Sequence, residues 1–173
     1  MPHRHRLARS ARLDVPAAVV YRVLADYREH HPHILPKAFS NLVVEKGGIG
    51  AGTLITFDLR VAGVTKHYRQ VVTEPEPGRV LAEREESGTG VTSFTVDPIG
   101  PDACEVTIAT EFDARGGLGG AIERWLAGRL LPRLYADELE RLAKYSADVR
   151  TLQAIQRQKE NGSSRSPFVS CNG

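Results

Sequence analysis

The chain has 173 residues, of which 41% are hydrophobic, 25% charged and 6% aromatic, a composition typical of a globular domain. Its formal net charge of +2 and its two cysteines exclude a strongly basic duplex-binding domain and a disulfide scaffold. No apolar run reaches the roughly 18 residues of a membrane span, so we expect a cytoplasmic protein with no stable membrane insertion. The surplus of Lys and Arg lies at the two ends of the chain, so we expect no nucleic-acid partner.

The first two predicted elements are a strand and a helix. Residues 7–14 alternate apolar and polar side chains, which is the pattern of a half-buried strand. Apolar residues then recur at helical spacing, and because proline is tolerated in the first turn of a helix, residues 15–26 predict a helix that begins near Pro16. We expect residues 1–6, which precede the strand, to form a flexible basic arm.

The segment 28–36 holds two prolines and three histidines, and it predicts a loop or a short second helix. The histidines, His30, His31 and His33, are potential metal ligands, but their spacing matches no zinc motif. We therefore expect a solvated loop near the rim of a pocket, and no metal site.

Six further strands are predicted between residues 39 and 113, where short alternating or β-branched runs are separated by turn residues. Apolar side chains share one face of several of these strands, and threonines and acids occupy the other. One face of the sheet is therefore expected to be buried and the other solvated. We place the strands at residues 39–46, 53–61, 64–74, 79–86, 91–98 and 104–113.

The third of these strands leaves its orientation open. Alternation places Tyr68 and Gln70 on one face. It places His67 and Arg69 on the other, and either face can be the inner one. Inward His67 and Arg69 would bind a carboxylate or an enolate, whereas inward Tyr68 and Gln70 would offer neutral hydrogen bonds. The next strand raises the same question for Arg84, which is flanked by two glutamates.

The longest helical pattern begins at Leu118, where leucine and isoleucine recur in steps of four residues as far as Leu134. Trp125 lies on or beside this apolar stripe. Charged residues, Glu138 among them, are expected to form its solvated complement.

One domain is expected over residues 7–150, followed by the helix end and a disordered tail at residues 151–173. The tail is predicted because the composition turns to Gln, Lys, Asn, Gly and Ser beyond about residue 155. Such a segment has too few apolar side chains to bury.

The predicted fold class is α+β. Seven antiparallel strands present one apolar face, and only the C-terminal helix is long enough to cover it. Because a twisted sheet curves while a helix is straight, their apolar faces need not meet everywhere, so a cavity is expected between them. The residues expected to line this cavity and bind a ligand come from the strands and the helix: Ile55, Phe57, Tyr68, Arg84, Phe94, Val96, Ile108, Trp125, Leu126 and Leu130.

Four segments of the chain resemble a known family. Residues 13–27 resemble the family's opening strand and helix, and Gly50 to Thr53 resemble the segment before its third strand. Residues 74–81 resemble its turn between the fourth and fifth strands, and residues 138–145 resemble the end of its long last helix. On these segments the chain resembles the START-like or Bet v 1-like (SRPBCC) superfamily, in its bacterial polyketide cyclase/dehydrase and lipid-transport branch, over residues 7–148. The resemblance implies the helix-grip fold, with two short helices between the first and second strands.

The resemblance also implies a cavity for a lipid-, isoprenoid- or polyketide-like molecule, with no universal catalytic triad and no cofactor. The first functional hypothesis is therefore binding or transport of such a hydrophobic small molecule, by a monomer or a homodimer. The second is an aromatase/cyclase or dehydratase acting on a β-keto intermediate, in which an inward side chain polarises a carbonyl or moves a proton; the candidates are His67, Tyr68, Arg69 and Arg84. An enzyme requires at least two ionisable or hydrogen-bonding side chains that converge in the cavity, whereas a carrier needs almost none.

Overall fold

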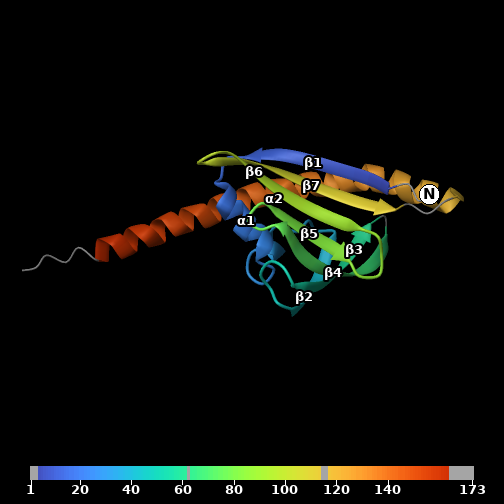
Figure 1. The fold of residues 1–173 in the computed structure, drawn as a ribbon, viewed down its shortest axis with the longest axis horizontal. Coiled ribbons are helices and arrows are strands. Elements are labelled where there is room, and N and C mark those ends of the chain that lie inside the picture. Colours follow the sequence, from blue (N-terminus) through green and yellow to red (C-terminus); the bar gives the residue numbers. More distant parts are fainter. Residues whose placement is uncertain (1–3, 62, 114–116, 164–173) are drawn as a thin grey trace, which may run out of the picture.

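The computed structural model describes residues 4–61, 63–113 and 117–163, with the backbone alone over 117–127 and 162–163. Its elements are β1 (Arg4–Leu13), α1 (Ala17–Ala25), the 3₁₀ turn η1 (His31–His33), β2 (Phe39–Lys46), β3 (Leu54–Val61), β4 (Val64–Glu76), β5 (Val80–Glu85), β6 (Val91–Gly100), β7 (Ala103–Asp113) and α2 (Gly117–Ser163). The strands form one antiparallel sheet in the order β1-β7-β6-β5-β4-β3-β2, with the long α2 running along it (Figure 1). The expected helix-grip architecture is confirmed.

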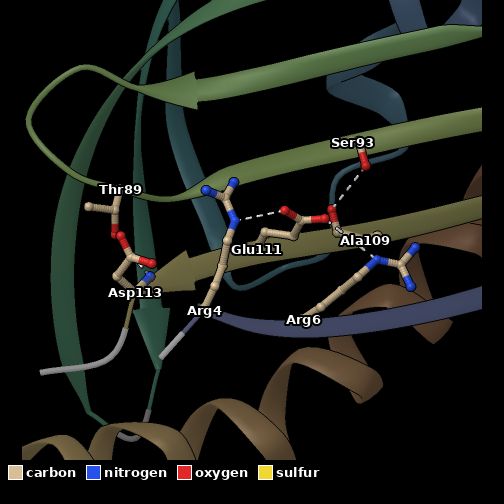
Figure 2. Close-up of polar contacts among 7 residues, drawn as sticks. All are labelled: Arg4, Arg6, Thr89, Ser93, Ala109, Glu111 and Asp113. Atoms are coloured by element: carbon tan, nitrogen blue, oxygen red, sulfur yellow. Dashed lines mark hydrogen bonds and ion pairs between the residues drawn. The ribbon is translucent and has the colours of Figure 1, made fainter. Parts of the chain in front are cut away.

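Strand β1 begins at Arg4, so residues 4–6 belong to the sheet and not to the basic arm in which the sequence placed them. β1 pairs with β7 along its whole length, from Arg4 opposite Asp113 to Leu13 opposite Cys104. The Glu111 carboxylate lies 2.8 Å from Arg4 Nε and 3.7 Å from the corresponding atom of Arg6 (Figure 2). The backbone pairing with β7 and these exposed ion pairs stabilise residues 4–6 as a strand, although their composition indicated a solvated arm. Residues 1–3 of the expected arm lie outside the described part of the chain.

Helix α1 begins directly after Pro16, as predicted, and buries its apolar side completely: Val20, Val23 and Leu24 have no exposed surface. It packs between α2 and β6. The segment that follows α1 is held against the sheet by the glycine-rich loop between β2 and β3. Tyr27 N donates to the carbonyl oxygen of Gly48, and Gly50 N donates to that of Ala25.

The loop approaches the segment after α1 so closely that only glycine fits at position 48. Gly48 has a φ of +136°, and a β-carbon there would overlap the side chain of Arg28. Arg28 in turn donates from Nε and Nη2 to the carbonyl oxygen of Gly47, at 3.0 and 2.7 Å. These contacts fix the positions of Tyr27 and His31 relative to the sheet.

Helix α2 continues to Ser163, well past the point at which the sequence predicted a disordered tail. Residues 156–160 are Gln, Arg, Gln, Lys and Glu, which are good helix formers even without apolar neighbours to pack against. This part of α2, drawn in orange to red in Figure 1, projects beyond the sheet. Residues 164–173 of the expected tail lie outside the described residues.

The sheet and α2 enclose a packed core in one half of the space between them. Phe94 pairs with Ile108 and Val96 with Val106 on the inner face of β6 and β7. These side chains are at most 2% exposed, and Leu142 of α2 is completely buried beside them. The other half of the space, toward the N-terminal part of α2, contains the cavity.

Candidate functional site

The cavity between the sheet and α2 has a volume of about 950 Å³. Its walls are mostly apolar, and they come from β2, β3 and β4 on one side, from β5, β6 and β7 on another, and from α2 across them. A few polar side chains converge among these apolar ones. The residues from β2 to β4 are Phe39, Leu42, Ile55, Phe57, Leu59, Val61, Val64, Lys66, Tyr68 and Gln70, and those of α2 are Leu130, Leu131, Leu134, Tyr135 and Glu138.

Half of the residues expected to line the cavity do so: Ile55, Phe57, Tyr68, Phe94 and Leu130. Two others, Val96 and Ile108, face inward but lie in the packed core beyond the closed end of the cavity. The alternation of their strands gave the right face, and the depth of the cavity along each strand could not be read from it. The side chains of Trp125 and Leu126 lie outside the described part of the structure.

Arg84 was expected in the cavity wall, and this prediction is wrong. In β5 the inward residues are Glu83 and Glu85, both of which line the cavity, while Arg84 between them is exposed on the outer face. The physical reason is that Leu81, fully buried on the same strand, fixes the register, and alternation from Leu81 brings the glutamates inward.

The open question about β4 is settled in favour of Tyr68 and Gln70. Both line the cavity together with Lys66. His67 faces the opposite side of the sheet, with Nδ1 2.8 Å from Asp58 Oδ1, and Arg69 is paired there with Glu45 and Glu86. The outer face therefore satisfies its charges locally, and the inner face of β4 presents the neutral Tyr68 and Gln70 with the basic Lys66.

The cavity has an open and a closed end. The open end is formed by the β3–β4 and β5–β6 hairpins, where Val64 is 69% exposed. Asp113 N donates to Thr89 Oγ1 at 3.0 Å, which ties the β5–β6 hairpin to the end of β7 (Figure 2). The closed end is formed by His31, Phe94, Glu83 and Glu138, none of which is more than 7% exposed. We call this end, together with Tyr27, Gln70 and Tyr135, the deep end.

Glu83 is the central polar residue of the deep end. Tyr27 donates from its hydroxyl to Glu83 Oε1 at 2.6 Å. Burial raises the pKa of Glu83 to about 7, and the hydrogen bond from Tyr27 opposes this rise only in part. A carboxyl group with such a pKa exchanges protons readily near neutral pH.

Glu138 approaches the deep end from α2, on the wall opposite Glu83. Burial raises its pKa to about 8, with additional contributions from the charges of Glu83 and Asp137. The helical pattern predicted that Glu138 lies on the solvated side of the helix, and this prediction is wrong, because Glu138 is 4% exposed. A signal was present, because Leu130, Leu134 and Glu138 continue the same four-residue step.

His31 is buried at the deep end, although the sequence predicted a solvated loop. Its Nδ1 lies 2.7 Å from the carbonyl oxygen of Leu24, to which it donates, and its ring stacks on Tyr27 at 4.3 Å. Burial lowers the pKa of His31 to about 4, so the imidazole is neutral at neutral pH. The 3.8 Å separation between His31 Nε2 and Glu83 Oε1 is therefore not an ion pair, and Nε2 carries a free lone pair.

Two further polar groups complete the deep end. Tyr135 of α2 donates from its hydroxyl to Thr110 Oγ1 at 2.5 Å, and Thr110 is also hydrogen-bonded to Thr92. Gln70 is 7% exposed, and its Oε1 has no hydrogen-bond partner among the described residues. The apolar cavity thus ends in a cluster of tyrosine, histidine, glutamine and two carboxyl groups.

A seven-stranded antiparallel sheet that holds a long C-terminal helix over an apolar cavity defines the class of helix-grip proteins. Residues 4–147 match the family described as polyketide cyclase / dehydrase and lipid transport, and the chain belongs to that family. Among curated proteins, none matched the sequence. None of the helices in the described residues is long and apolar enough to cross a membrane.

Solved structures share the fold. The KanY protein is 25% identical, with a TM-score of 0.74, over 84% of this chain and 99% of that one. The Zhui aromatase/cyclase from a Streptomyces species is 14% identical, with a TM-score of 0.69, over 84% and 94%. Norcoclaurine synthase from Thalictrum flavum, in complex with dopamine and hydroxybenzaldehyde, is 18% identical, with a TM-score of 0.63, over 85% and 88%.

Proposed function

We propose that this protein binds a largely apolar, carbonyl-bearing small molecule in the cavity and catalyses its cyclisation or dehydration by acid–base chemistry. The observation that carries the proposal is the pair of buried carboxyl groups, Glu83 and Glu138, on opposite walls of the deep end. Their pKa values, about 7 and about 8, allow one to be ionised while the other is protonated.

The chemistry follows from this difference in protonation. In the dehydration of a β-hydroxy ketone, the ionised carboxylate removes the proton from the carbon next to the carbonyl. The protonated carboxyl group gives its proton to the departing hydroxyl, the carbon–oxygen bond breaks, a carbon–carbon double bond forms and water leaves. Because the Tyr27 hydroxyl donates to Glu83 and stabilises its ionised form, Glu83 is the base and Glu138 the acid.

The size and the walls of the cavity support binding of an apolar substrate. Its volume of about 950 Å³ is at the upper end of the range for small-molecule sites, roughly 300 to 1,000 Å³. Each Å² of apolar surface removed from water contributes about 25 cal/mol before ordering costs. A long or fused-ring substrate would therefore be held mainly by the apolar walls and oriented by the deep end.

A carrier of a lipid-like molecule is the second candidate function. The family's description includes lipid transport, and most of the cavity wall is apolar. A carrier does not require two carboxyl groups to be buried, which costs stability at neutral pH. The converging polar groups of the deep end therefore favour the enzyme.

Turnover of a β-hydroxy ketone with a naphthyl ring distinguishes the two functions, because its dehydration to the conjugated enone is followed by absorbance. We expect the protein to accelerate this reaction. Glu83→Gln and Glu138→Gln, which keep the shape of the side chain, should each lower the rate by roughly 100-fold. Glu140→Gln, an exposed position on the same helix, serves as the control and should leave the rate unchanged. Calorimetric binding of the ketone without any acceleration over buffer would contradict the enzyme and leave the carrier.

A further inference from the structure

Three hydrogen-bond donors of the deep end, on Tyr27, Tyr135 and His31, are already used within the protein. The Tyr27 hydroxyl donates to Glu83, and the Tyr135 hydroxyl donates to Thr110. His31 donates from Nδ1 to the Leu24 carbonyl oxygen. In each case the donated hydrogen points to a protein oxygen and not to a ligand.

The acceptors of the deep end are not used in the same way. Gln70 Oε1 is buried and, among the described residues, has no partner. The neutral His31 ring has an acceptor at Nε2, which faces Glu83 at a distance too long for a hydrogen bond. The Glu138 carboxyl group, which also lines the cavity, accepts no hydrogen bond from the described residues. Burying such acceptors is costly unless a bound molecule supplies the missing donor.

The charges around the deep end point to the same kind of ligand. The groups that face it are Glu83 of β5, Glu138 of α2, the neutral His31 of η1 and the hydroxyls of Tyr27 and Tyr135. The cation among the lining residues is Lys66, whose Nζ lies 3.6 Å from Glu85 Oε1 and 4.4 Å from the centre of the Tyr68 ring. Its side chain is 60% exposed, so it belongs to the open end. A carboxylate head group would therefore meet two carboxyl groups without a countercharge.

We propose that the deep end is a subsite for a hydroxyl head group, which donates a hydrogen bond to Gln70 Oε1, and that it discriminates against carboxylates. The substrate class is thus an apolar molecule whose leading end carries a neutral hydroxyl, as in a β-hydroxy ketone, an enol or a phenol. This inference rests on the proposed function, because it assumes that the cavity binds the substrate. It further specifies that the hydroxyl end of the substrate lies at the deep end.

Three naphthalene probes of nearly equal size test the subsite. Naphthol donates a hydrogen bond, methoxynaphthalene has an acceptor and no donor, and naphthoate carries a negative charge. Titration calorimetry at neutral pH should give the tightest binding for naphthol, by roughly tenfold over methoxynaphthalene and by at least that factor over naphthoate.

Gln70→Leu removes the acceptor at nearly constant volume and tests the assignment to one residue. The tenfold preference for naphthol over methoxynaphthalene should disappear in this variant, while methoxynaphthalene binds as before. Thr65→Val, on the exposed outer face of the same strand, is the matched control and should keep the preference.

The outcomes separate this inference from the proposed function. If methoxynaphthalene or naphthoate binds as tightly as naphthol, or if the preference survives in Gln70→Leu, the hydroxyl subsite is wrong while binding in the cavity stands. If none of the three probes binds, both the subsite and the proposed function are contradicted. Turnover of the naphthyl ketone is measured independently of these affinities.

Discussion

Two glutamates decide what this cavity can do, and each lies one residue away from a solvated position. Glu83 is inward and Arg84 outward on the same strand. On α2, Glu138 is buried, whereas the neighbouring Asp137 and Glu140 pair with Arg141 and Lys144 near the surface. Burying a carboxyl group costs stability when it ionises, and the fold tolerates this cost at both positions.

The free energy of unfolding should therefore fall as pH rises through the neutral range. Unfolding returns the pKa of Glu83 and Glu138 from about 7 and about 8 to 4.5, so between these values the folded chain holds more protons. His31 acts in the opposite direction only below its ordinary 6.5, because its pKa is lowered to about 4. Between pH 6.5 and 8 the glutamates act alone, and we expect a loss of roughly 2 kcal/mol, measured by chemical denaturation.

Glu138→Gln removes the larger of the two shifts and should make the variant more stable than the wild type at pH 8, with a flatter dependence on pH. Glu140→Gln should keep the slope of the wild type. A wild-type protein that is equally stable at both ends of the range would show that these carboxyl groups are not buried as described.

Gln70 provides a second test at the scale of one residue. Its unpartnered Oε1 is destabilising in the free protein, so Gln70→Leu should raise the free energy of unfolding by about 1 kcal/mol. Urea denaturation of the ligand-free protein measures this. A lower stability in the variant would mean that the glutamine oxygen has a partner in solution.

Individual strands and helices were predictable where apolar side chains recur at a regular spacing in the sequence. Alternation placed β2 at residues 39–46 as observed, and it placed β3 from residue 53 where the strand begins at Leu54. The four-residue step of leucines identified α2. These periods reflect burial on one face, which a single chain reveals directly.

The same sequence periods could not predict which polar side chains line the cavity. Tyr68, Gln70, His67 and Arg69 alternate polar with polar, so neither face of β4 was marked as inner. Packing against β3 and β5 decides the orientation, and it is a property of the assembled sheet. Glu138 differs, because its place in the four-residue step indicated burial while its charge indicated a solvated position. Glutamate is seldom fully buried, so the charge decided the prediction, and the cavity beside Glu138 makes the exception possible.

The glycine loop between β2 and β3 positions Tyr27 and His31. Two substitutions in it distinguish the cost of backbone strain from the cost of displacing Arg28. Gly48→Ala should destabilise the fold by roughly 2 kcal/mol or more, because it adds the strain of a φ of +136° to the expulsion of Arg28. Gly52→Ala, with a φ of +83° and open space around it, should cost about 1 kcal/mol. Thermal melting compares them, and equal losses would show that Arg28 does not matter.

The whole molecule divides the space under its sheet into a packed half and an empty half. The packed half holds the fold together, so the walls of the empty half can be changed with little loss of stability. Leu130→Trp, which fills the open end, should leave the melting temperature nearly unchanged and prevent binding. Native mass spectrometry of the purified protein should show a bound apolar molecule in the wild type and in Leu152→Trp, an exposed control on α2, but not in Leu130→Trp. Retention of the molecule by Leu130→Trp would place it elsewhere.

The closed bottom and the open mouth of the cavity determine the order in which a guest enters it. Under the proposed function the reactive end enters first, and the rest of the molecule stays among leucines and aromatic rings near the hairpins or extends into water. In such a cavity the bond that reacts is set by its distance from the leading group, and the length of the tail has no effect on it. A series of homologous chains with the same first few carbons would then be handled at the same bond, whatever follows.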